Sequence, residues 1–153
     1  MIENIDVVIR LVLIAVISGL VGLEREHLKK PAGLRTNMLV GVGSTLIMIT
    51  ALHLYDILPE SSIDPGRLAG QVVTGIGFLG AGAIIRGRSG VHGLTTAAGI
   101  WVVSATGLAI GMGYYFAAIV TAIIMLVALF VFGRMEHHPD PTKNKDMTPT
   151  DLF

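Results

Sequence analysis

The chain has 153 residues, of which 52% are hydrophobic and 14% are charged, and its net charge at pH 7 is zero. Soluble domains carry roughly 25% charged residues, so this composition favours a single membrane domain whose main environment is lipid. The zero net charge gives no argument for a nucleic-acid partner, and we expect none. The lack of cysteine excludes disulfides, thiolate catalysis and thiolate metal sites. No cofactor is indicated.

The first apolar run, residues 7–23, contains one charged residue, Arg10, and is just long enough to cross a bilayer. Arg10 lies near its start, where a long side chain can extend to the membrane interface. A secretory signal peptide is the alternative interpretation. It lacks support, because no basic leader precedes the run and no small-x-small cleavage site follows it. We therefore expect an uncleaved first span.

The most charged part of the chain lies between the first two spans. A solvated loop explains its lysines, but polar groups that directly adjoin a span need partners at membrane depth. Two interpretations therefore stay open for this segment, a solvated loop and a buried polar cluster. The candidate members of the cluster are Glu24, Arg25 and Arg35, with Thr36 and Asn37 beside them at the start of the second span.

The second span is predicted over residues 36–55, with the small residues Gly41, Gly43 and Ser44 suited to a helix contact. The third is predicted over residues 68–85, after an Asp-Pro-Gly turn that begins a helix at Asp64.

Glycines mark two opposed faces of this third helix. At 100° per residue, Gly70, Gly77 and Gly80 share one face, and Gly75 and Gly82 lie on the opposite one. Small residues let membrane helices approach closely, so we expect the other spans to pack around this stretch on both sides. A polar stripe runs between the two faces and consists of Arg67, Gln71 and Thr74. We expect this stripe to face protein or water, because an amide exposed to lipid is costly.

The fourth and fifth spans are predicted over residues 94–110 and 116–132, separated by Gly-Met-Gly-Tyr-Tyr. Gly99 and Gly107 lie on one face of the fourth span and are further packing candidates. Residues 134–153 are polar and proline-rich, which predicts a disordered tail. His137 and His138 in this tail could bind a metal, but a solvated tail explains them as well.

Lysines and arginines are divided unevenly between the two ends of the predicted bundle. Nine lie in the first loop, the third loop and the tail, and only Arg10 and Arg67 lie at the other end. Cytoplasmic loops carry the excess of basic residues. The count predicts an outer amino terminus and a cytoplasmic carboxyl terminus in a bacterial inner membrane.

The residues from Gly75 to Gly80 match G-x-G-x-x-G, the pattern of dinucleotide-binding loops. That function needs a preceding strand and an acidic residue about 20 positions later. No Asp or Glu occurs between Asp64 and Glu136, so helix packing explains the pattern better. No nucleophile, base and acid occur at matched depth, and we expect no enzyme activity.

Four segments together resemble the MgtC/SapB family of membrane proteins. They are G-L-E-R-E at Gly22, A-G-L-R-T at Ala32, D-P-G-R-L-A-G-Q-V-V-T-G-I-G-F-L-G-A-G at Asp64, and G-L-T-T-A-A-G-I-W at Gly93. The resemblance implies a bacterial inner-membrane protein associated with magnesium limitation and with survival in host cells. It also implies regulation through other membrane proteins rather than established transport.

Longer members of that family carry a cytoplasmic ACT-like domain, so this chain is expected to be a short form. The family pattern marks several polar positions of this chain without assigning them a chemistry. These positions are Glu24, Arg25, Arg35, Thr36, Asp64, Arg67, Gln71, Thr95 and Thr96.

These observations predict an all-α, five-span membrane bundle. The leading hypothesis is a non-enzymatic regulator or adaptor that acts through helix contacts and forms a homodimer or larger assembly. The alternative is a small transporter or channel for cations, magnesium among them, with Asp64, Arg67 and Gln71 at its mouth. Asp64 and Arg67 could instead form a local structural pair.

Overall fold

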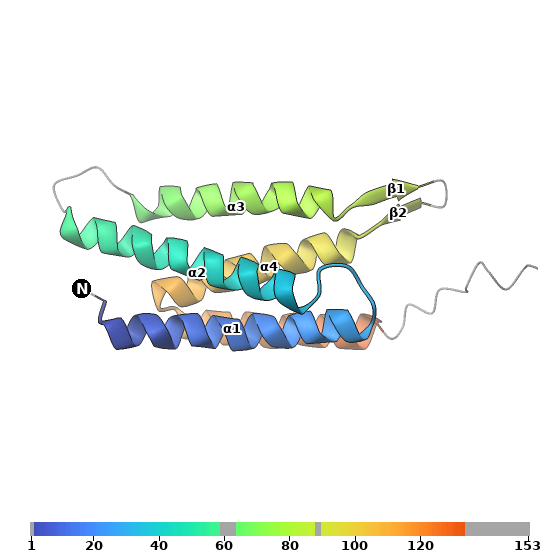
Figure 1. The fold of residues 1–153 in the computed structure, drawn as a ribbon, viewed down its shortest axis with the longest axis horizontal. Helices are drawn as coiled ribbons and strands as arrows, with labels where there is room; N and C mark the ends of the chain where they lie inside the picture. Colours follow the sequence, from blue (N-terminus) through green and yellow to red (C-terminus); the bar gives the residue numbers. More distant parts are fainter. Residues whose placement is uncertain (1, 59–63, 88–89, 134–153) are drawn as a thin grey trace, which may run out of the picture.

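The computed structural model describes residues 2–58, 64–87 and 90–133, and within these ranges the chain is a helical bundle with one small hairpin (Figure 1). The predicted all-α fold class is confirmed. The predicted tail, including His137 and His138, lies outside the described residues. The helices are α1 (Asn4–His27), α2 (Leu34–Ile57), α3 (Pro65–Gly82), α4 (Leu94–Met112) and α5 (Tyr115–Val127), and α5 continues into a π-helical turn, η1 (Ala128–Phe132).

Successive helices run in opposite directions along the bundle (Figure 1). The most extensive contacts are those of α2 with α4 and of α1 with α2, and α3 packs on α4 and on α2. Because α4 also contacts α1 and α5, it is α4 that lies at the centre of the bundle. The expectation that the other spans surround the third helix is therefore wrong within one chain.

Three helices, α1, α2 and α4, are long and apolar enough to cross a membrane by length and composition, and the apolar helix of Tyr115–Val131 is shorter. Helix α3 has 18 residues. At about 1.5 Å per residue it is about 27 Å long, close to the thickness of the hydrocarbon core. The bundle therefore suits a membrane, with α3 and α5 as its shorter helices.

Local residues explain both ends of α3. Asp64 precedes the helix and its side chain accepts a hydrogen bond from the backbone N–H of Gly66 at 2.8 Å, while Pro65 occupies the first turn. The helix ends at Gly82, three residues before the predicted end at Ile85. An antiparallel hairpin follows where a plain loop was expected, formed by β1 (Ile85–Gly87) and β2 (Gly90–His92), with Arg86 opposite Val91.

Gly93 joins this hairpin to α4 at a point where only glycine fits. Its φ is +90°, in the left-handed region, and a Cβ added there would lie 1.9 Å from the carbonyl oxygen of Ala83. The end of α3 and the start of α4 are held together at this point.

The closest helix contacts use glycines of the central helices. A Cβ at Gly107 would lie 2.7 Å from the carbonyl oxygen of Gly41, and one at Gly111 would lie 2.6 Å from the Cβ of Met48. At the edge of the bundle, a Cβ at Gly22 would lie 2.5 Å from the Cα of Leu34. Small residues thus allow α1, α2 and α4 to approach closely, as they do in membrane bundles generally.

Most of the glycines predicted to pack do not do so within the chain. Gly80 makes an ordinary contact, with a Cβ there 3.6 Å from the Cβ of Ala97. Nothing in the described part of the chain lies within 4 Å of a Cβ added at any of the others, which are Gly70, Gly75, Gly77, Gly82 and Gly99. The prediction fails within one chain for the glycines of α3 because that helix is peripheral, and for Gly99 because it lies on a side of α4 away from the crossing with α2. Their contact with another molecule stays a prediction.

Candidate functional site

Arg25 and Thr96 form a buried polar contact at the end of the bundle where the α1–α2 loop lies. The Arg25 guanidinium donates a hydrogen bond from Nη2 to Thr96 Oγ1 at 2.8 Å. Arg25 is 7% exposed and Thr96 is 4% exposed. The contact ties the last turns of α1 to the first turn of α4, so the structure brings together two of the predicted polar residues.

Glu24 lies beside this contact with its carboxylate turned away from solvent. Both carboxylate oxygens are buried, and neither has a hydrogen-bond partner within the described ranges. Glu24 also lines a groove of about 890 Å³ between the end of α1 and the segment where α5 continues into η1. Glu26, His27 and apolar residues such as Phe130 line the same groove. Burying a charged group without a partner is costly, so this carboxylate favours a cation that would pair with it.

Asn37, one of the predicted polar residues, and Glu26 hold the α1–α2 loop, whereas Arg35 and Thr36 do not. Arg35 and Thr36 are exposed, so they do not join the buried cluster. Asn37 is 2% exposed and donates to the carbonyl oxygens of Ala32 and Gly33 at 2.5 and 3.0 Å. Glu26, which the sequence did not single out, accepts a hydrogen bond from the backbone N–H of Leu34 at 3.1 Å. These bonds satisfy backbone groups at the start of α2.

The polar stripe of α3 lies on the outer surface of the bundle. Arg67, Gln71 and Thr74 are all exposed, and the Thr74 hydroxyl donates to the Gly70 carbonyl oxygen of its own helix at 3.0 Å. Asp64 caps the helix, and no ion pair joins it to Arg67 in the described part of the chain. The predicted local pair is therefore absent. Thr95 is likewise exposed, although Thr96 beside it is buried.

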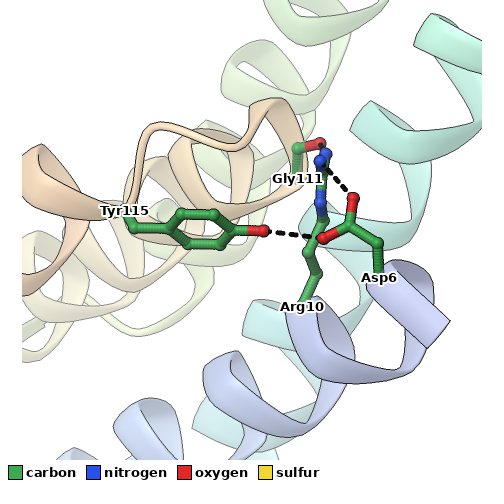
Figure 2. Close-up of polar contacts among 4 residues, drawn as sticks. All are labelled: Asp6, Arg10, Gly111 and Tyr115. Atoms are coloured by element: carbon green, nitrogen blue, oxygen red, sulfur yellow. Dashed lines mark hydrogen bonds and ion pairs between the residues drawn. The ribbon is translucent and has the colours of Figure 1, made fainter. Parts of the chain in front are cut away.

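The sequence analysis missed a polar clamp at the opposite end of the bundle (Figure 2). Arg10 donates from Nη1 to the Gly111 carbonyl oxygen at 2.6 Å and from Nη2 to Asp6 at 2.5 Å, and Tyr115 donates its hydroxyl proton to Asp6 at 3.0 Å. Arg10 is 9% exposed, so it turns inward where extension to the interface was expected. The spacing of Asp6 and Arg10, four residues apart on one helix, was the signal for an ion pair.

Hydroxyl groups join α2 to α4 in the interior. The Ser44 and Ser104 hydroxyls are 2.8 Å apart, and Thr45 donates to the Gly107 carbonyl oxygen at 2.8 Å. Ser18 and Thr106 donate to carbonyl oxygens of their own helices. These buried hydroxyls all have partners, so they hold helices together and leave no open polar path among themselves.

The Ser44–Ser104 contact gives a measurable coupling energy. We expect a double-mutant cycle of Ser44→Ala and Ser104→Ala to give about 0.6 kcal/mol, the typical value for interhelical hydrogen bonds in membranes. Unfolding in detergent would measure the four proteins of the cycle. A coupling near zero would mean that each hydroxyl is satisfied by its own helix, as Ser44 is in part by the carbonyl oxygen of Val40.

No group of three or more potential metal-ligating side chains occurs in the part of the chain that the structure describes.

The structure combines helices that have apolar outer surfaces with inward polar contacts at both ends of the bundle. These features define a polytopic helical membrane protein. The sequence model of the MgtC family matches residues 11–138, and the chain belongs to this family.

Several curated relatives support this membership. YhiD of Escherichia coli K12, named "Putative magnesium transporter YhiD", is 44% identical over 133 residues, covering 85% of this chain and 62% of YhiD. SapB of Bacillus subtilis is 37% identical over 128 residues, covering 81% of this chain and 55% of SapB. MgtC of Salmonella typhimurium LT2 is 39% identical over 121 residues, covering 79% of this chain and 50% of MgtC.

The chain thus spans between 50% and 62% of the length of these relatives. No solved structure matches it.

Proposed function

We propose that this MgtC-family protein is a non-enzymatic regulator or adaptor linked to magnesium limitation or stress, acting through helix contacts with itself or with other membrane proteins. The location of polar side chains that lack a hydrogen-bond partner in the described part of the chain supports this proposal. Arg67 and Gln71 are exposed on the outside of α3, whereas the buried hydroxyls between α2 and α4 are bonded. An amide exposed at membrane depth is stabilised when another protein covers it.

The proposed location is a bacterial inner membrane with the amino terminus outside. The α1–α2 loop and the β1–β2 hairpin lie at the same end of the bundle as the end of η1 (Figure 1). Lys29, Lys30, Arg35 and Arg86 lie at this end, which supports a cytoplasmic position.

Ion flux in proteoliposomes tests this proposal against transport. We expect wild-type protein to show no flux of magnesium or monovalent cations above that of empty liposomes. We also expect a photoreactive residue at position 71 to capture a membrane protein in native membranes. Flux from wild type that Asp64→Asn and Arg67→Ala abolish would contradict the proposal.

A small cation transporter is the second candidate, because Glu24 carries a buried carboxylate without a partner in the described ranges and YhiD is named as a magnesium transporter candidate. On this hypothesis, flux depends on that carboxylate, and Glu24→Gln abolishes it. Glu26→Gln is the matched control, since Glu26 lines the same groove but bonds the start of α2. Equal flux from wild type and Glu24→Gln would remove Glu24 from any pathway.

A further inference from the structure

The outer side of α3 carries a second regular pattern, which the glycine faces do not explain. Residues at alternating spacings of four and three form a seam along the whole helix, namely Asp64, Leu68, Gln71, Gly75, Phe78 and Gly82. Spacing of this kind, a repeat of 3.5 residues, lets two helices pack side by side over their full length.

The seam has no partner within residues 2–58, 64–87 and 90–133. Phe78 is 81% exposed, and no atom of these residues lies within 4 Å of a Cβ added at Gly75 or Gly82. The residues of α3 that pack inward are different ones, Val72 and Ile76. The seam thus lies to one side of the face that α3 turns to the bundle.

A groove of about 670 Å³ runs beside the seam, between α3 and α2. Leu68, Gln71 and Gly75 line it from α3, and Leu39 and Gly43 line it from α2. Among the described residues, none lies within 4 Å of a Cβ added at Gly43. With glycine on both walls, the groove has room for a large side chain such as Phe78 from another molecule.

We propose that a second copy of this chain occupies the seam and groove, with α3 of each copy against α3 and α2 of the other. The inference rests on the proposed function, since it names the surface through which the protein contacts itself. Copies with the same orientation in one membrane are related by a two-fold axis along the membrane normal, which makes the contact self-complementary.

Charge and hydrogen bonding favour a second copy as the occupant. The two-fold axis places identical residues at equal depth, and Asp64 and Arg67 lie one turn apart at the same end of α3. Asp64 of one copy is therefore offset by about one helical turn from Arg67 of the other, a distance that a long arginine side chain can reach. Gln71 meets Gln71 of the second copy, and an amide both donates and accepts a hydrogen bond. A polar residue within such a seam also fixes register and the number of helices.

Cysteine crosslinking tests this contact directly, because the chain has no cysteine. Gly75→Cys places a thiol in the seam. Gly77→Cys is the matched control, since it lies on the same helix, also has open space, and is rotated by about 200° from Gly75. Membranes treated with a mild oxidant should give a disulfide-linked dimer of Gly75→Cys and little dimer of Gly77→Cys.

A second variant measures the role of the amide. Gln71→Leu should weaken co-purification of two differently tagged copies by about three- to thirtyfold, the range for an interhelical hydrogen bond in a membrane. A dimer of Gly77→Cys without one of Gly75→Cys would overturn the seam. Folded protein that crosslinks at neither position, or that crosslinks at Gly75→Cys to a different protein, would overturn the second copy as occupant. These outcomes do not depend on whether the protein conducts ions.

Discussion

Replacing Gly107 by alanine is expected to destabilise the fold by about 3 kcal/mol, the upper end for overpacking a well-packed interior. The added Cβ would lie 2.7 Å from the carbonyl oxygen of Gly41 and 3.1 Å from Thr45 Oγ1. Because the first of these atoms is backbone, α2 and α4 must separate to admit the methyl group. That separation also stretches the hydrogen bond from Thr45 to the Gly107 carbonyl oxygen. Unfolding of purified protein in detergent measures the loss.

Gly99→Ala is the control on the same helix. In the part of the chain that the structure describes, nothing lies within 4 Å of a Cβ at Gly99, so the methyl group meets no neighbour there. Alanine favours a helix over glycine by about 1 kcal/mol, and this variant should be as stable as wild type or slightly more stable. Equal destabilisation of the two variants would mean that glycine flexibility, rather than the contact with Gly41, explains the effect.

The contrast between these two glycines shows what the sequence could predict about packing. Composition and apolar runs predicted the helices to within a few residues, because hydrophobic length is read directly from the chain. A helical wheel shows which glycines share a face, but it does not show which face meets another helix of the same chain. Gly107 and Gly99 share a predicted face, yet only Gly107 lies at the crossing with α2.

The polar residues show the same limit. Arg25 and Arg35 both adjoin a span, and the sequence left open whether either is buried. Arg25 is buried and Arg35 is exposed. The difference arises because the loop turns sharply at Ala32, whose φ is +55°, and Asn37 and Glu26 satisfy its backbone. Such a turn depends on three-dimensional closure. Arg25 bonds Thr96, 71 residues away, and Arg10 bonds the Gly111 carbonyl oxygen, 101 residues away. No local pattern reveals these two contacts, although the spacing of Asp6 and Arg10 did indicate their ion pair.

Replacing Arg10 by leucine is expected to cost about 2 kcal/mol, within the range for leaving a buried carbonyl oxygen without its hydrogen-bond donor. The change removes the donor to the Gly111 carbonyl oxygen and leaves Asp6 with Tyr115 as its hydrogen-bond partner. The Gly111 carbonyl lies next to the turn between α4 and α5, so the loss should loosen that end of the bundle. Unfolding in detergent, with hydrogen exchange of the α4–α5 turn, measures both effects.

Two further variants separate charge from geometry. Arg10→Lys keeps the charge but lacks the planar fork that bonds Gly111 and Asp6 together, so it should fall between wild type and Arg10→Leu. Arg35→Leu removes an exposed arginine at the other end of the bundle and should change stability by at most about 0.5 kcal/mol. If Arg10→Leu were as stable as wild type, apolar packing would replace the clamp at no cost. The contacts of Asp6, Arg10 and Tyr115 would then serve a purpose other than stability.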